Sequence, residues 1–497
     1  MSLGARLAEL ELLVAQLTSD NEILRVENST LRAENDTLRA EIVALKSKGS
    51  KHSGNSSMPP SRDQAGERQR QSVERQASKQ RRNGGTVRRA GGQPGATGTT
   101  LTMTDTPDQI EIHTPDVCGG CGNTLDGVDP VRVQRRQVVD VPPVVPVVTE
   151  HQVLTKVCPC CQTTTSGDFP DHVRAPISYG PRVRAFVVYL LARQHLPIER
   201  CRETVRDMCG IRMSTGTIDA IYTDAARRLA GFITTLTTAL RAMAVIHVDE
   251  TSDRVGTQTC WMHVVSTRML TLIHASTTRG VQAVHDAGVL AGYTGIIVHD
   301  RLAMYWQFTR ARHQACGAHL IRDLAHVAEV ATQKMWATAM SRLLVEINDA
   351  CDDARTRRLK TVAPQRQRQF AARYDQIVTD AHTANPPPAS GRKRNRLERD
   401  SHNLATAFTT HRAPILRFMY NLESSFTNNQ AERDLRPVKI HRKISSCFRQ
   451  IEGAQRFATV RSYLSTTRKN DIPAINALTD LFNNQPWLPT AASDLRR

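Results

Sequence analysis

The hydrophobic positions near the N-terminus recur every seven residues. Three of the companion positions hold Asn21, Asn28 and Asn35, and asparagine buried at such positions favours a parallel, two-stranded coiled coil in register. The repeat predicts a leucine-zipper homodimer over residues 1–46, with a long monomeric surface helix as the alternative. The leucines of the repeat are Leu3, Leu10, Leu17, Leu24, Leu31, Leu38 and Leu45.

The hydrophobic pattern stops after this repeat. Residues 47–100 are rich in Gly, Ser, Gln, Pro and Arg, and this composition predicts a disordered linker. From Lys46 to Thr100, twelve lysines and arginines oppose three acidic residues, a net charge of +9. The charge predicts sequence-independent contact with phosphates, and a solvated spacer is the alternative. A basic-leucine-zipper factor is disfavoured because its basic helix precedes the zipper. The candidate DNA-binding residues of the linker are Arg81, Arg82, Arg88 and Arg89.

Two pairs of cysteines within residues 101–175 have the spacing of zinc knuckles. Cys118 and Cys121 form the first pair, and Cys158 and Cys161 form the second. Four thiolates can bind one tetrahedral structural Zn²⁺ ion, which a small β module of this length needs for its stability. The spacing therefore predicts a zinc-binding module.

Two features of this module leave alternatives open. The segment 138–148 is rich in valine and proline and predicts strands with breaks. Cys160 competes with Cys161 as the fourth zinc ligand, although the C-x-x-C spacing favours Cys161. A redox role for the cysteines is the lesser alternative, because no thioredoxin-like pattern surrounds them.

Helical periodicity begins after the cysteines and predicts a helical domain over residues 176–242. Ser214 to Thr217 has the pattern of a turn and N-cap that leads into a helix over 218–229. A helix-turn-helix DNA-binding domain and a plain helical connector both agree with this pattern. The apolar stripe of the first helix is formed by Val183, Phe186, Val187, Leu190 and Leu191.

Short apolar, β-branched runs then predict strands in residues 243–310. The first run ends in Asp249 and Glu250, and the fourth ends in a histidine followed by Asp300. Three hairpin-linked strands, a helix and a fourth strand are the layout of an RNase H-like α/β domain, in which the first and fourth strands are neighbours. The four runs are 244–251, 260–265, 269–275 and 293–300.

This layout predicts a magnesium site, because neighbouring strands would bring Asp249 and Asp300 close enough to share an ion. Alternation along the strand places Glu250 on the opposite face. A strand that simply runs into a polar turn is the alternative for the first carboxylates.

A third carboxylate occurs far downstream, in the region 426–497. Asn428 and Asn429 predict the caps of a helix that carries Glu432 in its first turns. An acid beside a cluster of basic residues fits a metal ligand next to a scissile phosphate, and a solvated, salt-bridged helix start is the alternative. The basic residues are Arg433, Arg436, Lys439, Arg442 and Lys443.

The region 311–425 is too long for a simple connection between the second and third acids. It predicts an inserted helical subdomain with long helices over 325–359 and 365–384. Cys316 and His319 have metal-like spacing, but two ligands favour a role in packing over a second zinc site. The tail after residue 449 is periodic and is predicted to pack against the catalytic sheet.

The overall composition agrees with a nucleic-acid partner. The chain has 497 residues, 40% of them hydrophobic, and a formal net charge of +18, which points to a polyanion such as DNA. No apolar stretch reaches the length of a membrane span, so we expect a soluble, cytoplasmic protein with no membrane partner.

Taken together, these motifs resemble the insertion-sequence-66 (IS66) family of bacterial transposases, from the linker to near the C-terminus. The resemblance implies a multidomain α/β protein of the DDE type, in which an RNase H-like catalytic domain is interrupted by the helical insertion. The motifs besides the cysteine pairs are Asn55-Ser-Ser57, Pro59-Pro60, Gly91-Gly-Gln-Pro-Gly95, Thr99-Thr-Leu101, Tyr179-Gly-Pro181, His195-Leu-Pro197, Ser214-Thr-Gly-Thr217, His247-Val-Asp-Glu-Thr251, His299-Asp300 and Asn428-Asn-Gln-Ala-Glu-Arg433.

The resemblance implies a catalytic triad of Asp249, Asp300 and Glu432 that holds two Mg²⁺ ions, with Mn²⁺ as a substitute, and a structural Zn²⁺ site. It implies DNA as partner, both the element's ends and the target, association with the bacterial nucleoid, and accessory proteins encoded by the element. Cleavage and strand transfer would proceed by in-line phosphodiester displacement. A catalytically inactive DNA-binding regulator and a two-metal nuclease without strand transfer are the alternatives.

Overall fold

The computed structural model describes residues 14, 16–32, 34, 101–170, 173, 175–387 and 393–489. The linker residues Arg81, Arg82, Arg88 and Arg89 and most of the leucine repeat lie outside them. Residues 16–32 are helical, and the three leucines of the repeat within them are each more than half exposed: Leu17, Leu24 and Leu31. An uncovered leucine stripe is compatible with a zipper, and its pairing stays a prediction.

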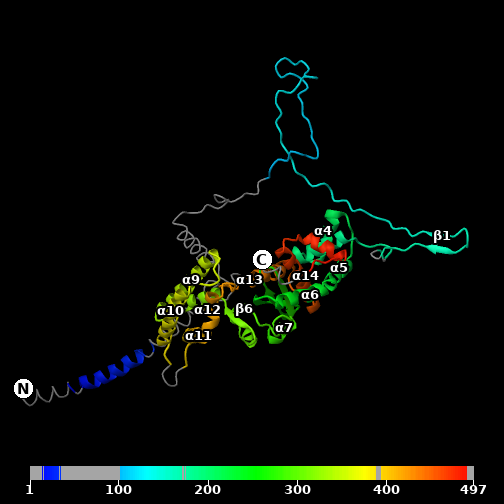
Figure 1. Ribbon diagram of the computed structural model, residues 1–497. Helices are drawn as coiled ribbons and strands as arrows, with labels where there is room; N and C mark the ends of the chain where they lie inside the picture. Colours follow the sequence, from blue (N-terminus) through cyan, green and yellow to red (C-terminus); the bar gives the residue numbers. More distant parts are fainter. Residues whose placement is uncertain are drawn as a thin grey trace, which may run out of the picture.

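The cysteine-containing module has little regular structure. Its two strands, β1 (Thr155–Val157) and β2 (Thr164–Ser166), pair in antiparallel fashion at the end of an extended arm (Figure 1). The strands predicted over 138–148 are wrong, because this segment is exposed and carries no strand pairing. Its prolines, Pro142, Pro143 and Pro146, lack the backbone N–H groups that a strand ladder requires.

The predicted helical domain is present. Ser214 caps the third helix, because its hydroxyl accepts a hydrogen bond from the backbone N–H of Thr217 at 3.1 Å. Gly210, with φ +67°, ends the second helix in the left-handed conformation that glycine tolerates. The elements are α3 (Pro181–Val188), which continues into the π-helical turn η2 (Tyr189–Arg193), then α4 (Ile198–Cys209), α5 (Thr215–Arg228) and α6 (Ala230–Arg241).

A five-stranded sheet with the order β5-β4-β3-β6-β7 follows. The first three strands form an antiparallel meander, whereas β6 is parallel to both β3 and β7. The first and fourth strands are therefore neighbours, as predicted. The strands are β3 (Val245–Val255), β4 (Gln258–Ser266), β5 (Thr271–Ser276), β6 (Ile296–His299) and β7 (Arg312–Ala315), with α7 (Val281–Asp286) and the 3₁₀ turn η3 (Ala303–Gln307) in the connections.

Two strand predictions need correction. Strand β3 does not end at its carboxylates but continues to Val255, because residues beyond Asp249 pair with β4 as far as a tight turn at Gly256. Strand β7 lies inside the region predicted to be a purely helical insertion. It was missed because its sequence, Arg-His-Gln-Ala, contains a single apolar residue and no alternation.

Helices cover both faces of the sheet. On one face, α13 (Asn429–Ser445) and α14 (Ile451–Lys469) bury Val264 and Ile273 of the sheet against Leu435 and Phe457. On the other face, a larger core joins the sheet to the helical domain and α15 (Ala474–Phe482). Ser462 of α14 also donates and accepts hydrogen bonds at the backbone of Ile273. The predicted packing of the tail against the sheet is confirmed.

The insertion forms a helical unit with its own core (Figure 1, yellow to orange). The helix predicted over 325–359 begins only at Lys334, whereas the second predicted helix is confirmed. The chain enters and leaves at one point, where the N–H of Gly317 donates to the carbonyl of Phe426 at 2.8 Å. The helices are α8 (Gly317–Val327), α9 (Lys334–Thr356), α10 (Pro364–Thr383), α11 (Arg396–Thr410) and α12 (Arg412–Tyr420).

Candidate active site

Asp249 lies in the middle of β3, just past the end of its pairing with β6. The parallel pairing stops at His247, opposite Val298, so β3 continues alone on that side. The register with β4 places Asp249 opposite Val264, and directly opposed side chains share a face of the sheet. Asp249 therefore faces the side that α13 covers.

The pKa of the Asp249 carboxyl lies well above its ordinary value. Burial is the largest cause, followed by the negative charges of Glu250, Asp300 and Glu432. The N–H of Glu250 donates to its Oδ1 at 2.9 Å and opposes this rise. Three segments that are distant in the sequence thus bring their carboxylates into one electrostatic environment.

Asp300 directly follows β6, and its Oδ1 accepts a hydrogen bond from the N–H of Leu302 at 2.9 Å. The next residue, Arg301, has φ +77°, which is unusual for a non-glycine residue. Two contacts hold this conformation: the Arg301 N–H donates to Nδ1 of His299 at 3.1 Å, and its guanidinium pairs with Asp323 of α8. The backbone after Asp300 is therefore fixed from both the sheet and the insertion.

Glu432 lies in the first turn of α13, and Asn428 attaches the start of this helix to the sheet. Asn428 is fully buried, and its Nδ2 donates to the carbonyl of Val248 at 2.7 Å, one residue before Asp249. Its Oδ1 lies 3.2 Å from Nδ1 of His247. Asn428 is the N-cap residue of α13, as predicted, but its side chain makes no capping hydrogen bond to the helix. Asn428 instead sets the position of the helix relative to β3.

Two basic residues of α8 lie beside Glu432 and were not predicted. Nδ1 of His319 is 4.0 Å from Oε1 of Glu432, and a guanidinium nitrogen of Arg322 is 3.8 Å from the same oxygen. Burial is the main cause of the lowered pKa of His319, and the charge of Arg322 adds to it. The spacing of Cys316 and His319 was the only sequence signal. Cys316 itself is buried and accepts a hydrogen bond from the Asn428 N–H at 3.1 Å, which agrees with a packing role.

Glu250 differs from its neighbour Asp249 in having positive and hydroxyl partners. Its side chain is 3% exposed, and the Arg279 guanidinium donates to one carboxylate oxygen at 2.7 and 3.1 Å. The Tyr305 hydroxyl donates to the other oxygen at 2.8 Å. Asp249 has no such ion pair within the described residues. This difference makes Asp249 the stronger candidate for binding a cation.

The carboxylates have the donor chemistry of a magnesium site but do not form a closed coordination shell in this conformation. Carboxylate oxygens are the ligands that Mg²⁺ prefers, and a divalent cation would offset the charges that raise the pKa of Asp249. Within the part of the chain that the structure describes, no three His, Cys, Asp or Glu side chains are close enough together to hold a metal ion.

A basic face continues along α13 from Glu432. Helical spacing places Arg436, Lys439 and Lys443 on the same side as Glu432, at successive turns. All three basic side chains are exposed, as are Arg433 and Arg442, and no described acidic residue forms an ion pair with any of the five. An exposed basic stripe that leads to a cluster of carboxylates suits a phosphate backbone.

The comparison with known protein families decides the relationship. The model of the IS66 family of transposases matches residues 176–456, more than half of the chain. The chain belongs to the IS66 transposase family. A second model, the zinc-finger binding domain of transposase IS66, matches residues 115–162, and a family of unknown function matches residues 2–101.

One relative is an uncharacterized protein, y4hP, from Sinorhizobium fredii (strain NBRC 101917 / NGR234). It is 24% identical to this IS66-family chain over 386 residues, which cover 66% of each protein. The chain thus spans just under two thirds of that relative. Among the helices that the structure describes, none is long and apolar enough to cross a membrane.

The zinc-finger match spans all the predicted zinc ligands of this IS66-family chain and supports zinc binding. Each cysteine pair forms the same turn: the N–H groups of Gly122 and Gln162 donate to the carbonyls of Cys118 and Cys158, both at 2.9 Å. Hydrogen bonds within the turns lower the pKa of the thiols of Cys118 and Cys161. The two turns are not brought together into one metal site within the described residues. A single site with four thiolates stays a prediction.

Proposed function

We propose that this protein is a DDE transposase that cleaves DNA at the ends of its element and joins them to target DNA, with Asp249, Asp300 and Glu432 as catalytic carboxylates. One observation carries the proposal. The pKa of the buried Asp249 is raised by both Asp300 and Glu432, although the three residues come from separate segments. Asp249 has no ion-pair partner among the described residues, and a buried carboxylate that approaches other carboxylates in this way is suited to binding divalent cations.

The sheet supports an RNase H-like assignment for the catalytic domain. An antiparallel meander followed by two parallel strands, with the first and fourth strands adjacent, is the order expected for that fold. The insertion between β7 and α13 agrees with a catalytic domain that is split in the sequence.

The residues around the triad have separate tasks in this proposal. Two Mg²⁺ ions, or Mn²⁺ in their place, would activate water or a 3′-hydroxyl group and stabilise the leaving oxygen. Asn428 fixes Glu432 relative to Asp249, and the contacts of Arg301 fix the backbone after Asp300. Arg279 and Tyr305 bind Glu250 and keep it from competing for the cations.

DNA would bind along the basic face of α13. Arg436, Lys439 and Lys443 follow Glu432 at helical spacing and are free to contact successive phosphates. The basic linker would add contacts without sequence preference, and the zipper of residues 1–46 would pair two copies of the chain. Two copies are needed if each is to hold one end of the element.

The proposal is tested by an assay of strand transfer with Mg²⁺ and DNA that includes the sequences flanking the gene on both sides. Asp249→Asn keeps the shape of the side chain and removes its charge. We expect it to reduce joining by at least about a hundredfold, since even the residues that support metal ligands contribute 10- to 100-fold. Glu250→Gln is the matched control and should retain most of the activity.

The outcomes separate the proposal from its alternatives. Equal joining by wild type and Asp249→Asn would reject the triad. Nicking without joining by the wild type would identify a nuclease. Specific binding of the end sequences without either reaction would identify a regulator.

A further inference from the structure

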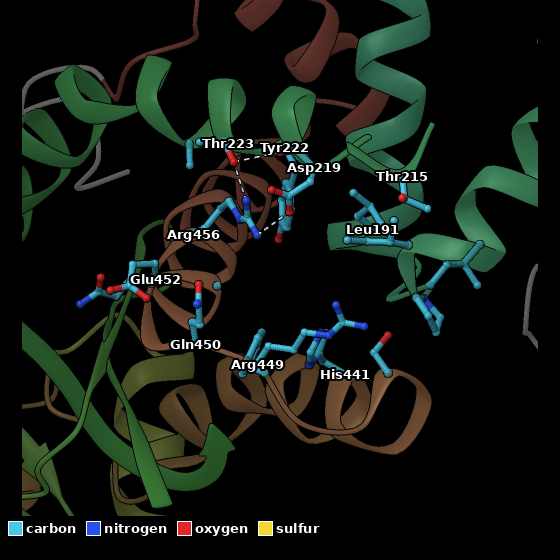
Figure 2. A pocket seen from close by; sticks show the side chains of 18 of the residues that line it. Leu191, Thr215, Asp219, Tyr222, Thr223, His441, Arg449, Gln450, Glu452 and Arg456 are labelled. Atoms are coloured by element: carbon cyan, nitrogen blue, oxygen red, sulfur yellow. Dashed lines mark hydrogen bonds and ion pairs between the residues drawn. The ribbon is translucent and has the colours of Figure 1, made fainter. Parts of the chain in front are cut away.

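A cavity of about 1050 Å³ lies outside the candidate active site, between the helical domain and the helices that follow the insertion. Helices α4 and α5 form one side, and the end of α13 and the start of α14 form the other (Figure 2). Its volume is at the upper end of small-ligand pockets, which measure roughly 300–1000 Å³. The carboxylate triad contributes no residue to its lining.

Aromatic side chains stand on two sides of this cavity. Phe448 and His441 stack on each other, with ring centroids 4.5 Å apart and planes at 9°. On the other side, the guanidinium of Arg456 lies 5.1 Å from the ring centre of Tyr222. Rings and guanidinium planes are the surfaces on which proteins stack unpaired nucleobases.

Several polar atoms of the lining are buried and have no hydrogen-bond partner. They are the hydroxyl of Tyr222, Nδ1 of His441 and Nε of Arg456. Tyr222 is only 8% exposed. Buried polar groups in folded proteins nearly always have partners. A ligand with hydrogen-bonding edges would supply them, whereas a purely apolar ligand would not.

The cavity lies at the end of α13 that is farther from Glu432. Ser445, the last residue of that helix, lines the cavity from the side of α13 opposite Glu432. The exposed Arg449 follows it and also lines the cavity (Figure 2). Thirteen residues separate Glu432 from Ser445, or roughly 20 Å along a helix. At roughly 3.4 Å per nucleotide, this distance corresponds to about six nucleotides of one DNA strand.

We propose that this cavity binds one nucleotide of a DNA strand turned out of the duplex, about six positions from the phosphate at Glu432. The base would lie between Phe448 and the Tyr222–Arg456 pair, and its phosphate would contact Arg449. The position rests on the proposed function, whereas the ligand chemistry rests on the cavity. A free nucleotide has the same chemistry, so the test must distinguish the two sources.

The test measures binding of the full-length protein to DNA without divalent metal, so its result is independent of catalysis. The probe is a 30-base-pair duplex with one unpaired 2-aminopurine nucleotide in its centre. Reference duplexes are fully paired, or carry an abasic nucleotide at the same bulge. We expect the bulged base to raise affinity about tenfold over both, within the range for stacking of one base, and its fluorescence to fall on binding.

Two substitutions link the preference to the cavity. Tyr222→Phe removes only the unpartnered hydroxyl, so it should leave the stability unchanged or higher while reducing the preference for the bulged base. Arg449→Ala should reduce it as well. Arg436→Ala, on the basic face but outside the cavity, is the matched control and should weaken binding of all three duplexes equally.

Each other outcome would overturn the proposal. Equal affinity for the three duplexes would show that no base enters the cavity. Equal affinity for the bulged and abasic duplexes, above that for the paired duplex, would show that the protein recognises only the bend of the DNA at the bulge. Competition by deoxyadenosine monophosphate without a bulge preference would assign the cavity to a free nucleotide. A bulge preference that Tyr222→Phe leaves intact would place the base elsewhere.

Discussion

Two sets of side chains in this protein come from distant positions in the sequence, and they reach their places differently. Asp249, Asp300 and Glu432 lie near one another because apolar strands and helices pack beneath them. The cysteine pairs at 118–121 and 158–161 lie in a module with two short strands and no buried core. Packing positions the first set, whereas we expect the second set to depend on a bound zinc ion for its arrangement.

Zinc removal should show this difference most strongly. Metal-coupled folding of small zinc modules contributes on the order of 10 kcal/mol. We expect chelation to make residues 101–175 sensitive to limited proteolysis, while the thermal unfolding of the rest of the protein stays unchanged. Cys158→Ser should abolish bound zinc, measured by elemental analysis. Cys160→Ser is the matched control and should keep its zinc. Loss of zinc in this variant would show that Cys160, and not Cys161, is the fourth zinc ligand.

Asn428→Ala tests the packed side of the comparison. The substitution leaves the buried carbonyl of Val248 without its donor and frees the start of α13, so we expect a loss of about 3 kcal/mol in the free energy of unfolding. Urea denaturation measures it. Asn429→Ala changes the exposed neighbour and should cost much less. If both variants lost the same free energy of unfolding, the side chain of Asn428 would have no role beyond the helix cap that the sequence suggested.

Asp253 is a carboxylate that packing buries outside the proposed triad. It is 1% exposed, and burial raises its pKa to about 6. The folded protein therefore holds its proton more tightly than the unfolded chain, so stability present below about pH 4 is lost as the pH rises through about 6. We expect Asp253→Asn to be more stable than wild type by roughly 2 kcal/mol at pH 7, with little difference at pH 3.5.

Denaturation curves at the two pH values check this prediction for Asp253. Asp286→Asn, at an exposed carboxylate, is the control. Mg²⁺ should leave the stability gain of Asp253→Asn unchanged. A gain that disappears with Mg²⁺ would place a cation at Asp253.

Ser214→Ala should have the smallest effect. Loss of the N-cap hydrogen bond to Thr217 should cost about 1 kcal/mol in the free energy of unfolding. Thr234→Ala, at an exposed position inside α6, is the comparison and should change stability by less. If both variants matched wild type, the cap would contribute nothing beyond the packing of α5.

The sequence predicted those parts of the fold whose signal is local. Strands β3 to β6 were found because apolar and β-branched residues occur in short runs, and the Ser214 cap because its motif is contiguous. Strand β7 was missed because only its last two residues, Gln314 and Ala315, are buried, and its pairing with β6 leaves no apolar pattern in the sequence. The role of Asn428 was misjudged because its partner, Val248, is 180 residues away.

The residues of the candidate site also divide into those with a local signal in the sequence and those without one. Asp249 and Asp300 were identified because each follows an apolar run in the sequence. The pairing of β3 with β6 then brings the two residues near each other. His319 and Arg322 were not associated with Glu432, since only the three-dimensional path of the insertion brings α8 beside α13. The prediction of strands over 138–148 was wrong because the valines of this segment favour strands, whereas Pro142, Pro143 and Pro146 prevent strand pairing.

The contact between Gly317 and Phe426 holds the two ends of the insertion together. A Cβ atom on Gly317 would lie 2.0 Å from the ring of Phe426, so the two ends of the insertion are held almost in contact. The outer part of the insertion, away from α8, can therefore grow or shrink without changing the path of the chain on either side. Helix α8 cannot be exchanged in this way, because its Asp323 pairs with Arg301 and its Arg322 lies 3.8 Å from Glu432.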